Sequence, residues 1–191
     1  MDPHVERMAT LLKEAKEAVE GELYDSPVND AEDRLIGNFP ALKASISGRT
    51  VRVALLDVPG AQDHFSIIAA SRPRFSVSLR KEGQFDWVAK LLGQVADLRV
   101  GVKEFDSEYL VSGYPADGVK DYLIREDVRG WLKEINPMEA FAVGSGYVRA
   151  SFPLTPQSAY TIEDLRQRVV SMVRLAEAAE AIEVASDEDV F

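Results

Sequence analysis

Residues 50–80 contain three strand-like segments in succession, and this run restricts the fold more than any other part of the chain. Thr50–Val58 alternates at its start and stops at Pro59-Gly60, a strong turn signal. His64–Ser71 reads as a second strand, and Phe75–Arg80 alternates between apolar and polar residues. Connections this short leave no room for a crossover helix, so we predict an antiparallel meander.

Amphipathic helices are predicted at both ends of this region. The first covers residues 3–20, and the last begins at Thr161, where Asp164 forms a capping-box variant, and runs to about Ala185. Both carry apolar residues in steps of three and four: Val5, Met8, Leu12, Ala15 and Val19 in the first, and Ile162, Leu165, Val169, Met172, Ala176 and Ala179 in the last. Each stripe packs on the sheet, on the other helix, or on a second subunit. Met8, Leu12 and Met172 are therefore candidate interface residues.

The rest of the chain alternates between short elements and turns. Residues 22–40 have the composition of a loop, with one helical turn at most around Ala31–Ile36. The pattern then predicts a helix over Asp86–Leu92, strands over Leu98–Val102 and Glu108–Ser112, a helix over Asp117–Glu134, and strands over Ala140–Val143 and Tyr147–Phe152 around a Gly144-Ser145-Gly146 turn.

This order of elements predicts an α+β fold with a mainly antiparallel sheet of about five to seven strands, covered by helices. Strands that follow one another directly argue against a doubly wound α/β fold. We divide the chain into an N-terminal amphipathic helix and loop at 1–40, a single α+β domain at 41–185, and an acidic tail at 186–191.

Composition excludes several classes of function. The 22 basic and 32 acidic residues give a net charge of −10, which repels phosphate backbones, so we expect no nucleic-acid partner. The absence of cysteine excludes disulfides and thiol catalysis. Residues 1–22 carry charge every few positions, and no window approaches the roughly 18 apolar residues of a transmembrane helix. The expectation is a soluble, cytoplasmic protein without a membrane span.

No catalytic or metal-binding residues are predicted. The two histidines are His4 and His64, too few for a histidine metal site in a chain without cysteine. His64 beside Asp63 or Asp57 is the alternative of a general base, but we expect a solvated loop histidine. Asp106 is expected to cap a turn. We therefore expect no cofactor.

A local basic cluster is the remaining polar feature. Arg72, Arg74, Arg80 and Lys81 lie close together in the sequence, and they are candidates for contact with an anion or an acidic partner. The alternative is a solvated sheet face. Trp131 and Leu132 are expected on the buried face of their helix.

Four segments carry a resemblance to a known family: GRTVRV at 48–53, RFSVSLRKEG at 74–83, GVKEFD at 101–106, and the strand–helix region 107–132. Together they resemble an uncharacterised bacterial domain of unknown function, of the DUF3137 type, over roughly residues 45–180. The resemblance implies a Phe-Asp pair before a strand, then a helix, a hairpin and a last helix. It implies no reaction and no ligand.

Three functional hypotheses remain. The first is a non-enzymatic interaction or binding module whose partner is an unknown protein or a second copy, as in a homodimer. The second is a small-molecule-binding protein or enzyme that uses carboxylates and arginines on an open sheet face. The third is a peripheral membrane adaptor that uses the first helix. A concave pocket with convergent polar groups favours the second hypothesis.

Overall fold

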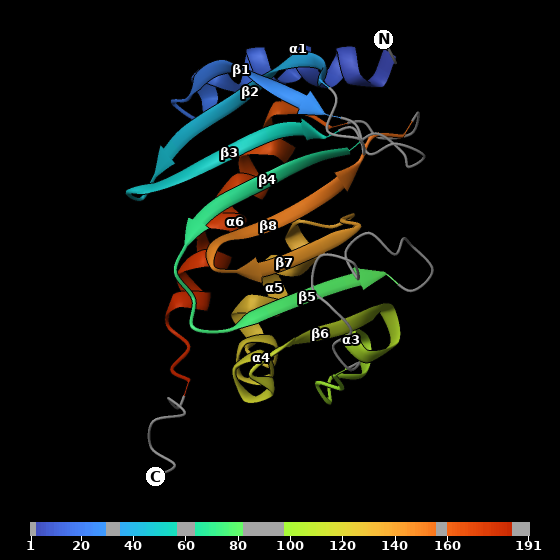
Figure 1. The fold of residues 1–191 in the computed structure, drawn as a ribbon, viewed down its shortest axis with the longest axis vertical. Coiled ribbons are helices and arrows are strands. Elements are labelled where there is room, and N and C mark those ends of the chain that lie inside the picture. The colour runs from blue at the N-terminus through green and yellow to red at the C-terminus, as the bar shows by residue number, and fades with distance from the viewer. Residues whose placement is uncertain (1–2, 30–34, 57–63, 82–97, 156–159, 185–191) are drawn as a thin grey trace.

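The computed structural model describes residues 3–29, 35–56, 64–81, 98–155 and 160–184 (Figure 1). Its strands are β1 (Glu22–Asn29), β2 (Leu35–Ile46), β3 (Arg49–Leu56), β4 (His64–Ser71), β5 (Ser76–Lys81), β6 (Tyr109–Tyr114), β7 (Ala140–Gly144) and β8 (Gly146–Pro153). Its helices are α1 (Pro3–Ala18), α3 (Lys103–Glu108), α4 (Ala116–Leu123), α5 (Glu126–Glu134) and α6 (Ile162–Glu180).

One antiparallel sheet organises the described chain. Its eight strands lie in the order β1-β2-β3-β4-β8-β7-β5-β6, more strands than the sequence predicts. The α+β class and the antiparallel pairing are confirmed. The three-strand meander is wrong in its last step, because β4 pairs with β8 and β5 lies between β7 and β6.

The insertion of the β7–β8 hairpin follows from the composition of β4. Six of the eight residues of this strand, HFSIIAAS, are buried, which is typical of a strand with neighbours on both edges. β8 supplies the second neighbour through a register of eight residue pairs, from His64 opposite Pro153 to Ser71 opposite Gly146. The predicted turn at Gly144-Ser145-Gly146 is confirmed, with Gly146 at φ 94°.

Residues 22–40 are not a loop. Of these residues, 22–29 form β1 and 35–40 form the first half of β2, and 30–34 lie outside the described residues. The pairing of β1 with β2 extends the sheet across the boundary drawn between residues 40 and 41. The prolines and aspartates of this region are typical of loops, but an edge strand tolerates them too. Pro27 lies in the edge strand β1, and Asp25 in the same strand is exposed. The predicted helix over Asp86–Leu92 and the tail at 186–191 lie outside the described residues.

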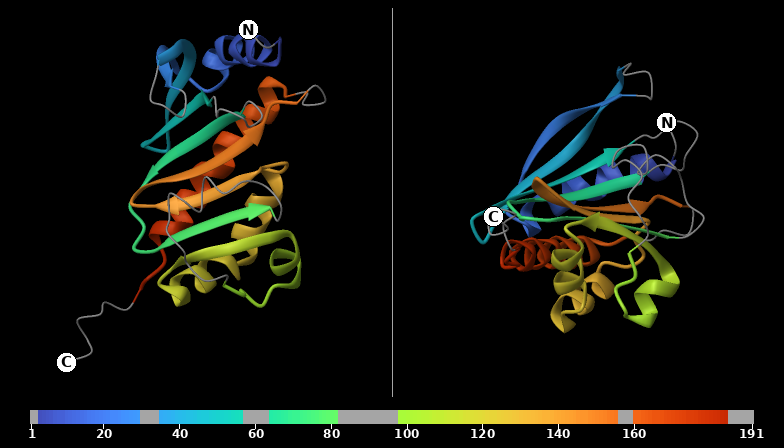
Figure 2. Two further views of the ribbon diagram at one scale, coloured as in Figure 1. Left: turned by 45° about the vertical axis from the view of Figure 1, so that its right-hand side comes forward. Right: turned by 60° about the horizontal axis from the view of Figure 1, so that its bottom comes forward.

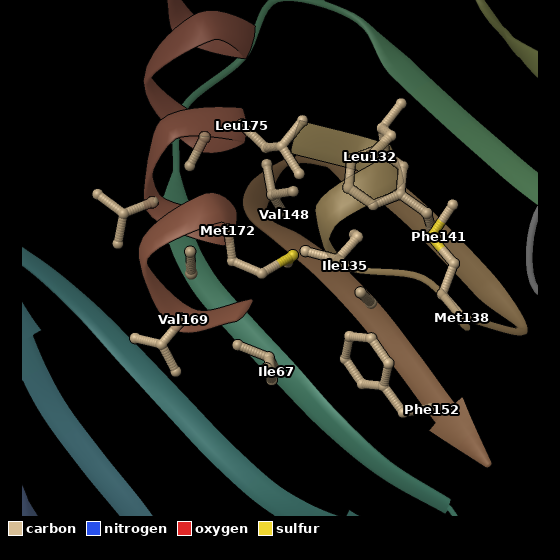
Figure 3. Close-up of a cluster of buried hydrophobic side chains, with 14 of the residues drawn as sticks. Ile67, Leu132, Ile135, Met138, Phe141, Val148, Phe152, Val169, Met172 and Leu175 are labelled. Carbon is tan, nitrogen blue, oxygen red and sulfur yellow. The ribbon is translucent and has the colours of Figure 1, made fainter. Parts of the chain in front are cut away.

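The helices α1, α5 and α6 pack on one face of the sheet (Figure 2). Side chains of β4, β7 and β8 meet α5 and α6 in the centre of the core (Figure 3). Labelled members of this cluster are Ile67, Leu132, Ile135, Met138, Phe141, Val148, Phe152, Val169, Met172 and Leu175. The core is continuous, since α1 packs against β2 and also against α6.

The segment Asp117–Glu134 contains two helices and not one. α4 ends at Leu123, and Arg125 takes an extended conformation before α5 begins. The break lets Tyr122 and Val128, which would diverge on one straight helix, both reach the core. Leu132 is buried as expected, but Trp131 is only half-buried.

The predicted strand over Leu98–Val102 is also wrong. Leu98 donates a single backbone hydrogen bond to the Val111 carbonyl, and the chain then enters the short helix α3, which contains Asp106. The Asp106 carboxylate accepts from the backbone N–H groups of Val100 and Gly101, at 2.9 and 3.0 Å. Asp106 therefore stabilises a turn, as the sequence predicts, and Phe105 and Asp106 lie within α3, which is followed directly by the strand β6.

A buried arginine joins α5 to α6. Arg168 is 7% exposed, and its guanidinium donates to the carbonyl oxygens of Ile135 and Asn136 at the end of α5. The guanidinium lies 4.9 Å from the centre of the Phe152 ring and 5.4 Å from that of Tyr160. Burial lowers the pKa of Arg168. The helix end and the two aromatic faces offset this cost because each places negative potential around the cation.

Replacing Arg168 with methionine is expected to lower the free energy of unfolding by about 2–4 kcal/mol, because the buried Ile135 carbonyl and the part-buried Asn136 carbonyl lose their donor. Urea denaturation measures the loss. The matched control is Arg166→Met in the same helix, where the side chain is 58% exposed and its nearest carboxylate lies 3.6 Å away. A loss in the control as large as in Arg168→Met would contradict the assignment.

A second polar contact fixes the other end of α6. The Glu180 carboxylate accepts from both Nη atoms of Arg49 in β3, at 2.9 and 2.8 Å, and from the backbone N–H of Arg72 at 2.7 Å. These donors, Arg49 first, lower the pKa of Glu180 from 4.5 to about 2. The helix end is thus tied to the start of β3 and to the β4–β5 connection.

The lowered pKa predicts how the Glu180 contact depends on pH. Its stabilisation is complete above pH 4.5 and is lost as the pH falls from there towards 2, because the unfolded chain takes up the proton first. Since Glu180 is exposed to solvent, we expect Glu180→Gln to cost about 1 kcal/mol at neutral pH, a difference that vanishes in acid. Urea titrations from pH 7 to 2 test this, with the exposed Glu163→Gln as control. A difference that does not depend on pH would exclude the contact.

Candidate ligand-binding site

Strand alternation places a row of cations on the sheet face opposite the helices. In β2 and β3, the buried residues Leu42, Ala44, Val51 and Val53 flank two exposed cations, Lys43 and Arg52. Register continues the row across the strands: Glu22 lies opposite Lys43, Lys43 opposite Arg52, Arg52 opposite Ile68, and Ile68 opposite Arg149. Cross-strand neighbours lie about 5 Å apart, so five strands contribute to one surface.

This row crosses a hollow of about 840 Å³. The β1–β2 hairpin bends out of the plane of its neighbours, away from the helices, and this curvature makes the open face concave (Figure 2, right). The helices lie behind the sheet in Figure 1, so the open face of the sheet is turned towards the viewer. Its lining residues are Glu22, Leu23, Tyr24, Lys43, Thr50, Arg52, Ile68, Ala70, Ser145, Gly146, Tyr147 and Arg149.

Lys43 and Arg52 face each other without a counter-charge between them. Within the described part of the chain, neither side chain takes part in a hydrogen bond or an ion pair. Like charges directly opposite one another destabilise a strand pair. Glu22, the cross-strand neighbour of Lys43 on its other side, is the one carboxylate among the described lining residues. Among these residues, the two opposed cations therefore have a single carboxylate beside them.

Arg149 is held differently from the other two cations. It is half-buried, and its Nε–H donates to Ser66 Oγ at 3.3 Å. Ser66 Oγ is also 3.2 Å from Ser151 Oγ, and both serines are buried. Burial lowers the pKa of Arg149. The serines thus fix the guanidinium at the edge of the hollow.

His64 is not a solvated loop residue, which corrects the expectation for it. It begins β4, is 8% exposed, and its Nε2 contacts the Glu139 carboxylate just before β7. Asp57 and Asp63 lie outside the described residues. The imidazole–carboxylate pair has the chemistry of a general base. Ser66 and Ser151 are its polar neighbours in the sheet, but both are buried and bonded to each other, which favours a structural role.

The four residues of the predicted basic cluster do not lie together. Arg72 and Arg74 are exposed in the β4–β5 connection, and the backbone of Arg72 binds Glu180. Arg80 and Lys81 are half-buried at the other end of β5, a strand of six residues and so about 20 Å long. None of the four lines the hollow.

The candidate interface residues of the terminal helices lie inside the chain. Met8 is 2% exposed, and Leu12 and Met172 are fully buried. α1 contacts α6 and the sheet, so the structure shows the intramolecular packing that the sequence left open. These three side chains are not available to a second subunit.

Sequence reasoning missed Lys43, Arg52 and Arg149 because register alone unites them. A signal was present in the strands themselves, since Lys43 stands in ALKASI and Arg52 in TVRVALL as a cation within an otherwise apolar pattern. Position 149 repeats this in YVRASF. A cation at the same face of three strands was detectable only after their order was known.

The described residues contain neither a membrane-spanning helix nor a cluster of metal ligands. None of their helices is long and apolar enough to cross a membrane. No group of three His, Cys, Asp or Glu side chains within these ranges is placed to hold a metal ion.

Comparison with known proteins identifies the fold and no family. The sequence matches no model of a known protein family, and no curated protein is similar to it in sequence. The structure is similar to the crystal structure of the mycobacterial trehalose monomycolate transport factor A, TtfA, with a TM-score of 0.63. The two chains are 12% identical, and the match covers 94% of this chain and 98% of that one. At this identity the similarity shows a shared fold alone, and the resemblance to the DUF3137 type stays a prediction.

The opposed cations predict an unusual effect on stability. Arg52→Gln is expected to raise the free energy of unfolding of the unliganded protein by about 0.5 kcal/mol, because it removes a like-charge cross-strand pair. Urea denaturation at low salt measures the gain, which shrinks as salt is added. Arg74→Gln removes the same charge outside the row and serves as control. A larger loss of stability in Arg52→Gln than in the control would show that Arg52 is part of the structural framework.

Proposed function

We propose that this protein is a non-catalytic binding module that holds an anionic ligand in the hollow on its open sheet face. The observation that carries the proposal is the row of Lys43, Arg52 and Arg149 across neighbouring strands. Although the net charge of the protein is −10, these three cations line one hollow, and Lys43 and Arg52 lie directly opposite each other. A bound anion relieves that repulsion.

The lining supports binding in preference to catalysis. Its polar groups are cations, hydroxyls and phenols, and the described lining holds no histidine and a single carboxylate, Glu22. The imidazole–carboxylate pair of His64 and Glu139 lies elsewhere in the sheet, where His64 is buried. The groups in the hollow therefore recognise charge and shape, with no pair placed for proton transfer.

The size of the hollow supports a small ligand. At about 840 Å³ it lies within the range of small-molecule sites. Its walls are strands paired on both edges, apart from the outer strand β1, so the cations project from a rigid surface. This combination corresponds to the small-molecule hypothesis from the sequence, with its arginines at different positions.

A thermal-shift screen tests the proposal. The probes are a panel of water-soluble carboxylates, phosphate monoesters and sulfonates, each compared with sodium chloride at equal ionic strength. A ligand present at about ten times its Kd stabilises the folded state by about 1.4 kcal/mol. In a chain of this size, that stabilisation raises the melting temperature by about 3–5 °C. We expect such shifts in the wild type.

A pair of double variants decides whether the shifts arise in the hollow. Lys43→Gln/Arg52→Gln removes the opposed cations, and Arg72→Gln/Arg74→Gln removes the same charge from the exposed β4–β5 connection. The shifts are expected to disappear in the first variant and to persist in the second. Equal shifts in both variants, or none in the wild type, would overturn the proposal.

A further inference from the structure

The hollow is apolar as well as cationic, and this points to the class of ligand. Resting on the function proposed above, we propose that the ligand is a single-headed amphiphile: one carboxylate or phosphate monoester head attached to an alkyl or aromatic body. The head binds between Lys43 and Arg52, and the body extends over Ile68 and Ala70 towards Tyr147.

The head site follows from the opposed cations. Lys43 and Arg52 are direct cross-strand partners, so their charged ends can both reach one anionic group placed above the strand pair. The planar guanidinium of Arg52 offers paired donors that match a carboxylate or a phosphate, and Lys43 adds a point charge. Glu22, beside Lys43, adds negative charge at the outer side of the row.

The body site follows from what interrupts the row. Ile68 lies between Arg52 and Arg149 in register, and Ala70 lies opposite Tyr147 one step along the same face. Ile68 and Tyr147 are half-buried and Ala70 is exposed. A ligand that covers apolar surface at the floor of a hollow gains a binding free energy of roughly 25 cal/mol for each Å² removed from water. A purely inorganic anion leaves this surface uncovered.

Charge limits the ligand to few negative groups. The described lining of the hollow holds three cations and one carboxylate, whereas the whole chain carries −10. The long-range field of the chain therefore repels polyanions such as nucleic acids or strongly acidic peptides. A ligand with one anionic head is repelled only weakly by this field. At the head site it lies within the Debye length of about 8 Å from the cations, so salt does not screen the attraction.

The shape of the site favours a dissolved amphiphile over a membrane surface. Arg52 and Arg149 stand on inner strands of a concave face, with the bent β1–β2 hairpin at one side (Figure 2). A flat bilayer meets the rim of such a hollow and not its floor. A single molecule can enter it.

Isothermal titration calorimetry with three probes tests this inference. Decyl phosphate, kept below its critical micelle concentration, carries head and body; inorganic phosphate carries the head alone; decyl maltoside carries the same alkyl chain on a neutral head. We expect decyl phosphate to bind at least about tenfold more tightly than either of the others, which corresponds to about 1.4 kcal/mol.

Variants assign the two parts of the ligand to the two parts of the hollow. Arg52→Gln is expected to weaken decyl phosphate and inorganic phosphate alike, by about tenfold. Ile68→Asn is expected to weaken decyl phosphate by about tenfold and to leave inorganic phosphate unchanged. Arg74→Gln and Ile124→Asn, an exposed cation and a 49% exposed isoleucine away from the hollow, are the matched controls and should change nothing.

Each alternative outcome has a definite meaning. Equal affinity for decyl phosphate and inorganic phosphate overturns the amphiphile and leaves the anion-binding function intact. Equal affinity for decyl phosphate and decyl maltoside, with no effect of Arg52→Gln, overturns both. Cosedimentation with phosphatidylcholine vesicles that contain phosphatidic acid, in the absence of binding to monomeric decyl phosphate, identifies a membrane surface as the ligand and also overturns the inference.

Discussion

The pairing of β4 with β8 is the contact on which the rest of the structure depends. It joins the first four strands of the chain to the last four in sheet order, through a register that begins with His64 opposite Pro153. α6 packs across both strands, and α1 packs against α6. On the opposite face, the same pairing brings Ile68 next to Arg149 and so completes the cationic row. Core and hollow are two sides of one strand pair.

Polar groups at the ends of the helices determine how the two layers are aligned. Arg168 binds the carbonyl end of α5 from within the core, and Glu180 ties the end of α6 to Arg49 and to the backbone of Arg72. Hydrophobic contacts alone permit a helix to slide along a sheet, since they have no direction. The hydrogen bonds of Arg168 with the end of α5, and of Glu180 with Arg49 and Arg72, have direction and restrict that movement.

The sequence predicts elements whose signals are local. β4 has the predicted bounds, the Gly144-Ser145-Gly146 turn is a hairpin, and Thr161 and Asp164 form a complete capping box. The outer hairpin of β1 and β2 was missed because an edge strand buries too little to show alternation and tolerates proline. The break before Arg125 was missed because both of its flanks have helical composition.

The candidate site was less accessible from sequence than the fold. Residues 72–81 carry four cations within ten positions and so predict a basic cluster, but an extended strand places its two ends far apart. Lys43, Arg52 and Arg149 come from three strands whose order is set by the β4–β8 pairing. Composition also concealed them, since an acidic chain gives no reason to expect a basic surface. The order of the strands in the sheet, and not the amino-acid composition, shows that these three residues lie together.

The two-residue repeat of the strands has an evolutionary consequence. Leu42 and Val53 face the helices while their neighbours Lys43 and Arg52 face the hollow, so adjacent codons serve different selective pressures. Substitutions on the open face alter its charge and shape without disturbing the packed layer behind it. Chains with this scaffold can therefore diverge on the open face while keeping their architecture, which agrees with a shared fold at 12% identity. Selection that acts on the open face would change alternate positions along β2, β3 and β8 and leave those between them apolar.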